Sequence, residues 1–379
     1  MSKLDELIAE LCPDGVEYVK LSSICDIKRG ERVTKSQLIE DGIYPVFSGG
    51  VSPMGYFNKF NREENTITIA QYGTAGYVNW IDEKFWANDV CYSLFPKEVI
   101  NKRYLYFVLV NLQDYIYTLR IDAVPAHLPV DRLGNIKIPL PPLAVQQEIV
   151  RILDNFTELT AELTAELTAR RKQYEYYIDR VINANNYQHI PLNDVAKVYD
   201  GTHQTPNYTE SGVKFVSVEN INDLYGTTKR ISEVDFSKYK IKPQPGDVFM
   251  TRIGDVGTPA VVTTNEPIAY YVSLALIRPN KELLPQYLYF YIKSSAFRKE
   301  LYKRTLHTAV PIKINKEDIG KCRVAVPPIK EQQRVIALLS RFDTLCNDIS
   351  SGLPAEIEAR QKQYEYYRDK LLTFKEVTA

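Results

Sequence analysis

Basic and polar side chains gather in short turns after predicted strands, and their types suit paired hydrogen bonding better than bond-making chemistry. Arginine and glutamine can each form two parallel hydrogen bonds with one base edge, while lysine suits a phosphate. In the first half of the chain the candidates are Lys28, Arg29, Arg32, Lys35, Gln71, Tyr72, Thr74 and His127. In the second half they are Thr202, His203, Gln204, Thr205, Arg252, Asp255 and Lys313. The alternative is that these turns are ordinary solvated loops.

The turns need a scaffold, and the hydrophobic patterns of both halves predict one. Short β-branched and aromatic runs predict strands at Thr66–Ala70, Val213–Val218 and Asp247–Thr251. Apolar residues recur every three or four positions in Tyr104–Thr118 and Tyr287–Tyr302, which predicts a helix in each segment. Each half therefore contains a mixed α+β domain whose strands are joined by the polar turns.

The chain repeats itself once. RKQYEYY at Arg171–Tyr177 returns as QKQYEYY at Gln361–Tyr367, and the YLYF, Ala-Val-Pro and Pro-Pro motifs recur in the same order. The offset between matched residues grows along the chain, from 171 for Leu21 and Leu192 to 190 at the QYEYY motifs. A steady drift is what one duplication followed by insertions produces, so we expect the same architecture twice.

A proline stop and a long amphipathic helix follow each domain. Apolar residues keep to one side from Ala144 to Val181, a helix about 57 Å long. A matching pattern starts after Pro328, and Ser350–Pro354 should break or kink it. Because so long a helix needs a partner, we expect the two helices to pair antiparallel like a coiled coil, relating the domains by a pseudo-twofold axis. Alternatively, each helix merely caps its own domain.

A short tandem repeat lies inside the first helix. Thr160-Ala-Glu-Leu163 is followed at once by Thr164-Ala-Glu-Leu167. Four residues add about 6 Å and about 40° of rotation to a helix. The repeat is therefore a natural increment of helix length.

The sequence contains none of the common catalytic or nucleotide-binding motifs. There is no GxxxxGK[ST], HExxH or GxSxG run, and no Asn- or Asp-Pro-Pro-aromatic run. The four histidines form no close metal-binding pair, and the five cysteines form no CxxC pair, which favours reduced thiols. We expect no catalytic residue, no metal site and no cofactor bound by this chain, and hence a binding protein.

Composition sets broad limits on the function. The chain has 379 residues, with 47 basic and 47 acidic side chains, and the zero net charge counts mildly against nucleic-acid binding without excluding it. The 27 tyrosines suit interfaces. Acidic residues near the start and the shortness of the apolar run Tyr104–Val110 argue against a signal peptide and a membrane span. We expect a cytoplasmic protein with no membrane partner.

In these motifs, the chain resembles the specificity subunits of type I restriction-modification enzymes. The resemblance rests on IPLPPLAVQQEIVRIL at 138–153, on a long helix ending near RKQYEYY, and on the repetition of the whole. YPVFSGGVSPMGY at Tyr44–Tyr56 also resembles the target-recognition domains of that family. The resemblance implies target-recognition domains at 1–143 and 185–328, and helical spacers at 144–184 and 329–379.

The same resemblance implies a role and partners. Each domain would read one half of a split, asymmetric site in double-stranded DNA, and the helices would fix the spacing of the halves. Two modification subunits carrying S-adenosylmethionine would methylate an adenine in each half, and restriction subunits using ATP and Mg²⁺ would join them. The tyrosines of the repeated motif are candidates for subunit contacts, with packing between the helices as the alternative: Tyr174, Tyr176, Tyr177, Tyr364, Tyr366 and Tyr367.

Two other functions stay open at this point. A scaffold whose doubled domains bind other proteins would fit the zero net charge, and a salt-insensitive interaction without a DNA footprint would favour it. A nuclease with a duplicated site would reveal itself by metal-dependent cleavage of DNA.

Overall fold

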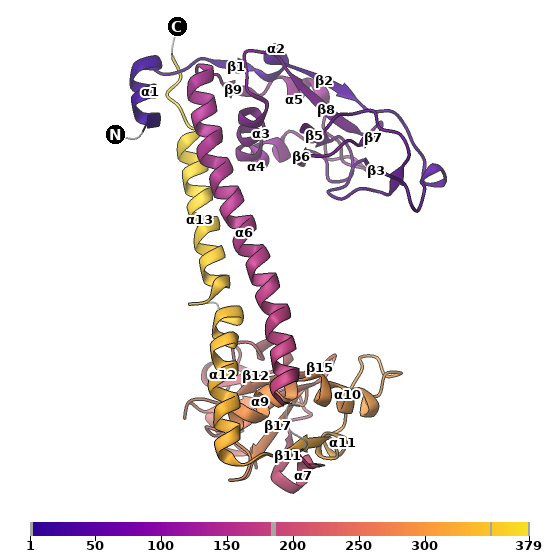
Figure 1. Cartoon of the computed structure of the whole chain (residues 1–379), viewed down its shortest axis with the longest axis vertical. Helices are drawn as coiled ribbons and strands as arrows, with labels where there is room; N and C mark the ends of the chain where they lie inside the picture. The colour runs from indigo at the N-terminus through magenta and orange to yellow at the C-terminus, as the bar shows by residue number, and fades with distance from the viewer. Residues whose placement is uncertain (1–2, 183–186, 349–350, 378–379) are drawn as a thin grey trace. The chain divides into compact units, whose positions relative to one another are not determined.

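The computed structural model of the chain describes residues 3–182, 187–348 and 351–377 (Figure 1). The chain divides into two compact units. Unit 1 consists of Met1–Leu163 together with Ile357–Ala379, and unit 2 consists of Thr164–Glu356. Each unit therefore takes residues from both copies of the repeat.

Unit 1 is built on an antiparallel sheet whose strands lie in the order β2-β8-β5-β6. A smaller sheet has the order β4-β3-β7, with β3 parallel to β7, and β1 pairs with β9. The strands are β1 (Tyr18–Lys20), β2 (Cys25–Arg29), β3 (Tyr44–Phe47), β4 (Tyr56–Phe57), β5 (Thr66–Ala70), β6 (Val78–Ile81), β7 (Trp86–Ala87), β8 (Cys91–Pro96) and β9 (Lys137–Pro139).

Unit 2 repeats this topology strand for strand. Its main sheet has the order β11-β17-β14-β15, its smaller sheet the order β13-β12-β16, and β10 pairs with β18. The strands are β10 (His189–Pro191), β11 (Ala196–Asp200), β12 (Tyr208–Val216), β13 (Arg230–Ile231), β14 (Val248–Ile253), β15 (Asp255–Val261), β16 (Ile268–Tyr270), β17 (Leu274–Pro279) and β18 (Arg323–Ala325). The predicted duplication and the mixed α/β class are confirmed.

The prediction of one helix in each YLYF segment, Tyr104–Thr118 and Tyr287–Tyr302, is wrong in one respect, because each segment contains two helices. In unit 1, α3 (Lys102–Asn111) ends before α4 (Gln113–Thr118), and in unit 2, α9 (Pro285–Lys293) ends before α10 (Ser295–Arg304). Ser294 has an extended backbone, and its hydroxyl accepts a hydrogen bond from the amide of Phe297, so it starts a new helix. Hydrophobic periodicity continues across such a break and cannot reveal it.

The first helix of each YLYF segment is largely buried in its unit. In unit 1, Tyr104, Leu105 and Val108 are buried in one cluster with Ile67 of β5 and Ile149 of the long helix. The short helical elements of unit 1 are α1 (Lys3–Leu11), α2 (Leu21–Ile24), η1 (Lys35–Gln37) and α5 (Val130–Gly134). Those of unit 2 are α7 (Leu192–Val195), η2 (Val218–Asn220), α8 (Glu233–Ser237) and α11 (Lys316–Gly320), of which α7 and α11 occupy the places of α2 and α5.

The predicted long helix is α6 (Leu143–Ile182), 40 residues or about 60 Å of continuous helix. The second long stretch is divided into α12 (Ile329–Asn347) and α13 (Leu353–Leu371). Described residues on either side of the expected Ser350–Pro354 break thus belong to different helices, while Ser350 itself lies outside the described residues. The break is confirmed.

Within each unit, α6 packs against a helix of the second copy. In unit 1, Phe156 of α6 stacks on Tyr367 of α13 with ring centroids 5.5 Å apart, and the two helices run in opposite directions (Figure 1). In unit 2, Tyr177 of α6 stacks on Phe342 of α12 at 5.3 Å, and Arg171 reaches the carbonyl of Cys346. The antiparallel pairing is therefore observed separately in both units.

Candidate nucleic-acid interface

In unit 1 the candidate turns converge at one end of the main sheet. Strand register places Arg29 opposite Tyr92 and Ala70 opposite Cys91, so β2 and β5 end on either side of the start of β8. The ring of Tyr72 stacks on His127 with centroids 5.5 Å apart, and their backbones form a bridge. The loops after β2 and β5 and the loop containing His127 thus form one surface.

The basic side chains of this surface are exposed. Lys28, Arg29, Arg32 and Lys35 are all accessible to solvent. Lys28 lies over the ring of Phe95 at 5.1 Å, and Arg29 lies over Tyr92 at 5.9 Å. Positive groups spread over aromatic rings suit a polyanionic partner.

The polar candidates of unit 1 are not equally accessible. Thr74 is exposed, and its hydroxyl donates to the carbonyl of Gly49 at 2.9 Å, which ties its turn to the Gly49-Gly50 loop. Tyr72 and His127 are half-buried. Gln71 is only 3% exposed, and its backbone carbonyl accepts from the amide of Leu128 at 2.9 Å. Gln71 therefore lies beneath the surface that its neighbours form.

Unit 2 brings the equivalent loops together in the same way. Asp200 lies opposite Ala275 and Thr251 opposite Leu274, so β11 and β14 end on either side of the start of β17. The amide of Gly254 donates to the carbonyl of Ile312 at 2.8 Å, which joins the β14–β15 turn to the loop containing Lys313. Most candidate side chains of this surface are exposed: His203, Gln204, Thr205, Asp255 and Lys313. Thr202 is half-buried.

Arg252 has a different place from its predicted one. Its side chain is buried, and its Nε donates to the carbonyl of Ile314 at 3.0 Å. Its Nη1 pairs with the carboxylate of Asp200, which also lies 3.9 Å from Lys316 Nζ. The guanidinium therefore holds the ends of β11, β14 and the 306–314 loop together from inside the unit.

These paired surfaces can be compared with known proteins. A family described as the type I restriction modification DNA specificity domain matches the chain twice, at residues 13–170 and 185–359. The chain belongs to the type I restriction-modification specificity subunit family. The predicted resemblance is thereby confirmed.

Relatives of this specificity subunit match it nearly end to end. A putative type I restriction enzyme specificity subunit of Haemophilus influenzae is 33% identical over 95% of this chain and 96% of its own. The EcoR124I/EcoR124II specificity subunit of Escherichia coli is 31% identical over 99% of this chain and 97% of its own. The S subunit from M. genitalium has the same fold, with a TM-score of 0.64 and 18% identity over 94% of this chain and 96% of that one.

Family membership fixes the broad role of the chain. A specificity subunit supplies DNA sequence specificity to a multi-subunit restriction-modification system and is not its catalytic subunit. Within residues 3–182, 187–348 and 351–377, no cluster of three or more His, Cys, Asp or Glu side chains could hold a metal ion. No helix in this described part is long and apolar enough to cross a membrane.

The candidate subunit-contact tyrosines of the specificity subunit divide into two groups. Tyr176 and Tyr366, at equivalent positions of the two motifs, are 58% and 62% exposed. The other members of the set pack inside the units: Tyr174, Tyr177, Tyr364 and Tyr367. Only the members of the first group are more than half exposed to solvent.

Tyr174 belongs to a polar cluster that the sequence did not predict. Its hydroxyl donates to Asp343 Oδ1 at 2.7 Å, Tyr289 donates to Oδ2 at 3.1 Å, and Lys293 Nζ lies 2.8 Å from Oδ1. Burial opposes ionisation of Asp343, but the charge of Lys293 and these hydrogen bonds hold its pKa below the ordinary value. The cluster fastens α9 to α6 and α12 within unit 2.

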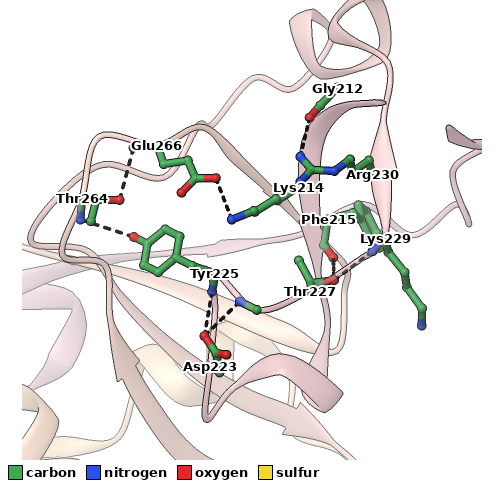
Figure 2. A network of polar contacts seen from close by, with 11 residues as sticks. Gly212, Lys214, Phe215, Asp223, Tyr225, Thr227, Lys229, Arg230, Thr264 and Glu266 are labelled. Atoms are coloured by element: carbon green, nitrogen blue, oxygen red, sulfur yellow. Dashed lines mark hydrogen bonds and ion pairs between the residues drawn. The ribbon is translucent and has the colours of Figure 1, made fainter. Parts of the chain in front are cut away.

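A second unpredicted network fixes the loop between β12 and β13 (Figure 2). Lys214 Nζ lies 2.8 Å from Glu266 Oε1, and the amide of Thr264 donates to the hydroxyl of Tyr225 at 3.3 Å. Asp223 Oδ1 accepts from the amide of Gly226 at 2.9 Å. These partners come from separate stretches of sequence without a motif, so no local signal could have found them.

Proposed function

We propose that this chain reads a bipartite, asymmetric DNA site, one half-site with the loop surface of each unit. The observation that carries the proposal is the twofold recurrence of the same three converging loops on the same sheet topology. The loops expose unlike side chains, with basic groups in unit 1 and a mixture of His203, Gln204 and Asp255 in unit 2. Unlike surfaces on like frameworks suit the recognition of two different short sequences.

The partners follow from the family and from the exposed tyrosines. We propose that two modification subunits, carrying S-adenosylmethionine and methylating adenine N6, dock beside Tyr176 and Tyr366. Restriction subunits using ATP and Mg²⁺ would complete the assembly, and this chain would bind none of these cofactors itself. The proposed setting is the cytoplasm, where the DNA and these cofactors are found.

We also keep the division into recognition segments 1–143 and 185–328 and spacer segments 144–184 and 329–379 as a proposal. The continuity of α6 through 40 residues supports a spacer that sets the distance between the recognition segments. Its length would set how many base pairs separate the two half-sites.

Methylome sequencing of the host tests the proposed function. Replacing Val16–Leu140 with the matching segment of a relative should change one half of the methylated motif and preserve the other half and the gap. The reciprocal exchange of Tyr187–Val326 should change only the other half. A motif that changes in both halves, or methylation that does not depend on this chain, would refute two independent reading units.

A further inference from the structure

A cleft of about 580 Å³ opens in unit 2 beside the loop surface. One wall is Tyr199–Asn207, the end of β11 and the loop after it, and the other is Asp235–Ile241, the end of α8 and the segment after it. Lys316 also lines the cleft. The second wall contains no residue that sequence motifs single out, yet it faces the loop that carries His203 and Gln204.

The acidic groups in this cleft are already neutralised. Asp200 is paired with the buried Arg252 and lies 3.9 Å from Lys316 Nζ. Asp235 lies 2.7 Å from Lys238 Nζ and accepts a hydrogen bond from Ser232 at 2.9 Å. Neither carboxylate is left to repel an anion.

The basic groups, by contrast, exceed the acidic ones. Lys238, Lys240 and Lys316 line the cleft, and Arg252 lies behind it, which makes four positive groups. The negative groups are Asp200 and Asp235 in the lining and Glu317, whose Oε1 lies 3.8 Å from Lys316 Nζ. Lys240 is exposed and has no ion pair within the described residues. The cleft and its ion-pair partners therefore carry a net formal charge of about +1.

Two lysines near the loop between β12 and β13 give no such excess of positive charge. In the network of Figure 2, Lys214 is paired with Glu266. Lys229 is paired in the same way, since its Nζ lies 2.9 Å from Glu219 Oε2. These lysines have local counter-charges. The charge surplus lies at the cleft and not at these two lysines.

The neutral side chains that line the cleft can also form hydrogen bonds with a ligand. Thr202, Gln204, Thr205 and Asn207 place hydroxyl and amide groups along one wall. Hydroxyls, amides and lysines are the groups that hold phosphate and sugar oxygens in protein–DNA complexes, where they set position without reading sequence. An open, cationic cleft lined by such donors matches a nucleic-acid backbone.

We infer that this cleft holds the sugar-phosphate backbone of one DNA strand, with Lys240 and Lys316 as phosphate contacts. The inference rests on the proposed function and adds a contact surface to it. In this arrangement both walls hold the strand, while the exposed His203, which does not line the cleft, stays available for a base edge. Lys240 and Lys316 thus contribute affinity without sequence preference.

The salt dependence of DNA binding tests this inference. The full chain, assembled with its modification subunits, would be titrated with a duplex of random sequence and one containing the methylated motif over a range of salt concentrations. Each lost phosphate contact lowers the slope of log K against log salt by about 0.9, so Lys240→Gln with Lys316→Gln should lower it by about 1.8. Both duplexes should lose affinity by the same factor, leaving their ratio unchanged.

Lys281→Gln is the matched control. Lys281 is exposed and follows β17 at the end of the sheet opposite Asp200, so its loss should leave the slope as in the parent. An unchanged slope in the double variant, or a changed ratio between the two duplexes, would overturn the inference while the parent still binds DNA. A parent complex that binds neither duplex would instead defeat the proposed function and the cleft with it.

Discussion

At the scale of single residues, two equivalent positions have exchanged their roles between the units. Arg29 and Asp200 end β2 and β11, while Gln71 and Arg252 occupy the matching place at the end of β5 and in β14. In unit 1 the arginine is at the exposed position, and in unit 2 it is at the buried one. The same framework therefore exposes an arginine, Arg29, on the surface of unit 1, whereas in unit 2 the arginine, Arg252, is buried in an ion pair.

This exchange predicts that Arg252→Gln weakens unit 2. Asp200 would lose its buried partner and the carbonyl of Ile314 a donor, and breaking a buried pair costs about 3–5 kcal/mol. Denaturant unfolding would measure the loss of stability. Methylome sequencing should show that sequence preference is lost in one half of the methylated motif and kept in the other.

The compensating variant is available within the chain itself. Asp200→Arg combined with Arg252→Gln copies the pair at Arg29 and Gln71 and removes the orphaned carboxylate. It should recover most of the lost stability. A single Arg252→Gln variant as stable as the parent would show that the buried pair contributes nothing.

Glu148 gives a prediction about pH. Hydrogen bonds from Arg151 and then Lys3, at 2.6 and 3.0 Å, outweigh burial and lower the pKa of Glu148 to about 2. In the unfolded chain the pKa is about 4.3, so the folded state gains stability above that pH and loses it as the pH falls toward 2. Between about pH 5 and about pH 3, Glu148→Gln should lose less unfolding free energy than the parent, as measured by urea titration. Equal losses would contradict this role.

At the scale of elements, the repeated Pro-Pro and Gln-Gln motif joins two helix starts. Gln146 Oε1 accepts from the amide of Asn101, the N-cap of α3, at 2.7 Å, while Nε2 donates to the carbonyl of Pro141 at 2.7 Å. Gln332 repeats this in unit 2, with the amide of Leu284 at 2.8 Å. The first glutamine of each pair therefore joins the start of a long helix to the start of a YLYF helix.

Gln146→Ala should therefore be costly, because it leaves two buried backbone groups without partners, a loss of about 2–4 kcal/mol. Gln147→Ala is the internal control, since Gln147 is adjacent and exposed. Thermal unfolding should separate the two variants clearly. Equal melting temperatures would mean that the buried bonds are replaced by water.

Elements with local signals were predictable and those made by distant contacts were not. Strand Thr66–Ala70 and the break before α13 match their expected positions, and α6 begins at Leu143, one residue before its expected start. The burial of Arg252 was not predictable, because its partners Asp200 and Ile314 lie 52 and 62 residues away. The wall at Asp235–Ile241 was missed for the same reason.

At the scale of the whole molecule, the tandem Thr-Ala-Glu-Leu repeat lies where α6 passes from one unit to the other. Unit 1 ends its first segment at Leu163, and unit 2 begins at Thr164, between the two copies of the repeat. A change in repeat number therefore alters the length of α6 at the boundary between the units, where Leu167 is the one leucine of the repeat that is buried.

One more Thr-Ala-Glu-Leu should lengthen α6 by about 6 Å and widen the gap between half-sites by about one or two base pairs. Both half-sites should stay the same, because neither loop surface is altered. Methylome sequencing of a strain carrying the insertion would measure the gap. An unchanged gap, or an altered half-site, would contradict the proposed spacer role.

The composition of the units also has an evolutionary consequence. Unit 1 includes most of α13, which belongs to the second copy of the repeat, and unit 2 includes the end of α6, which belongs to the first copy. Neither copy of the repeat therefore encodes a complete unit. Under the proposed function, recombination inside a loop-bearing segment would change the specificity of one unit at once. A crossover that alters a long helix must instead be tolerated by both units together, which favours exchange of the loops while the helices are inherited unchanged.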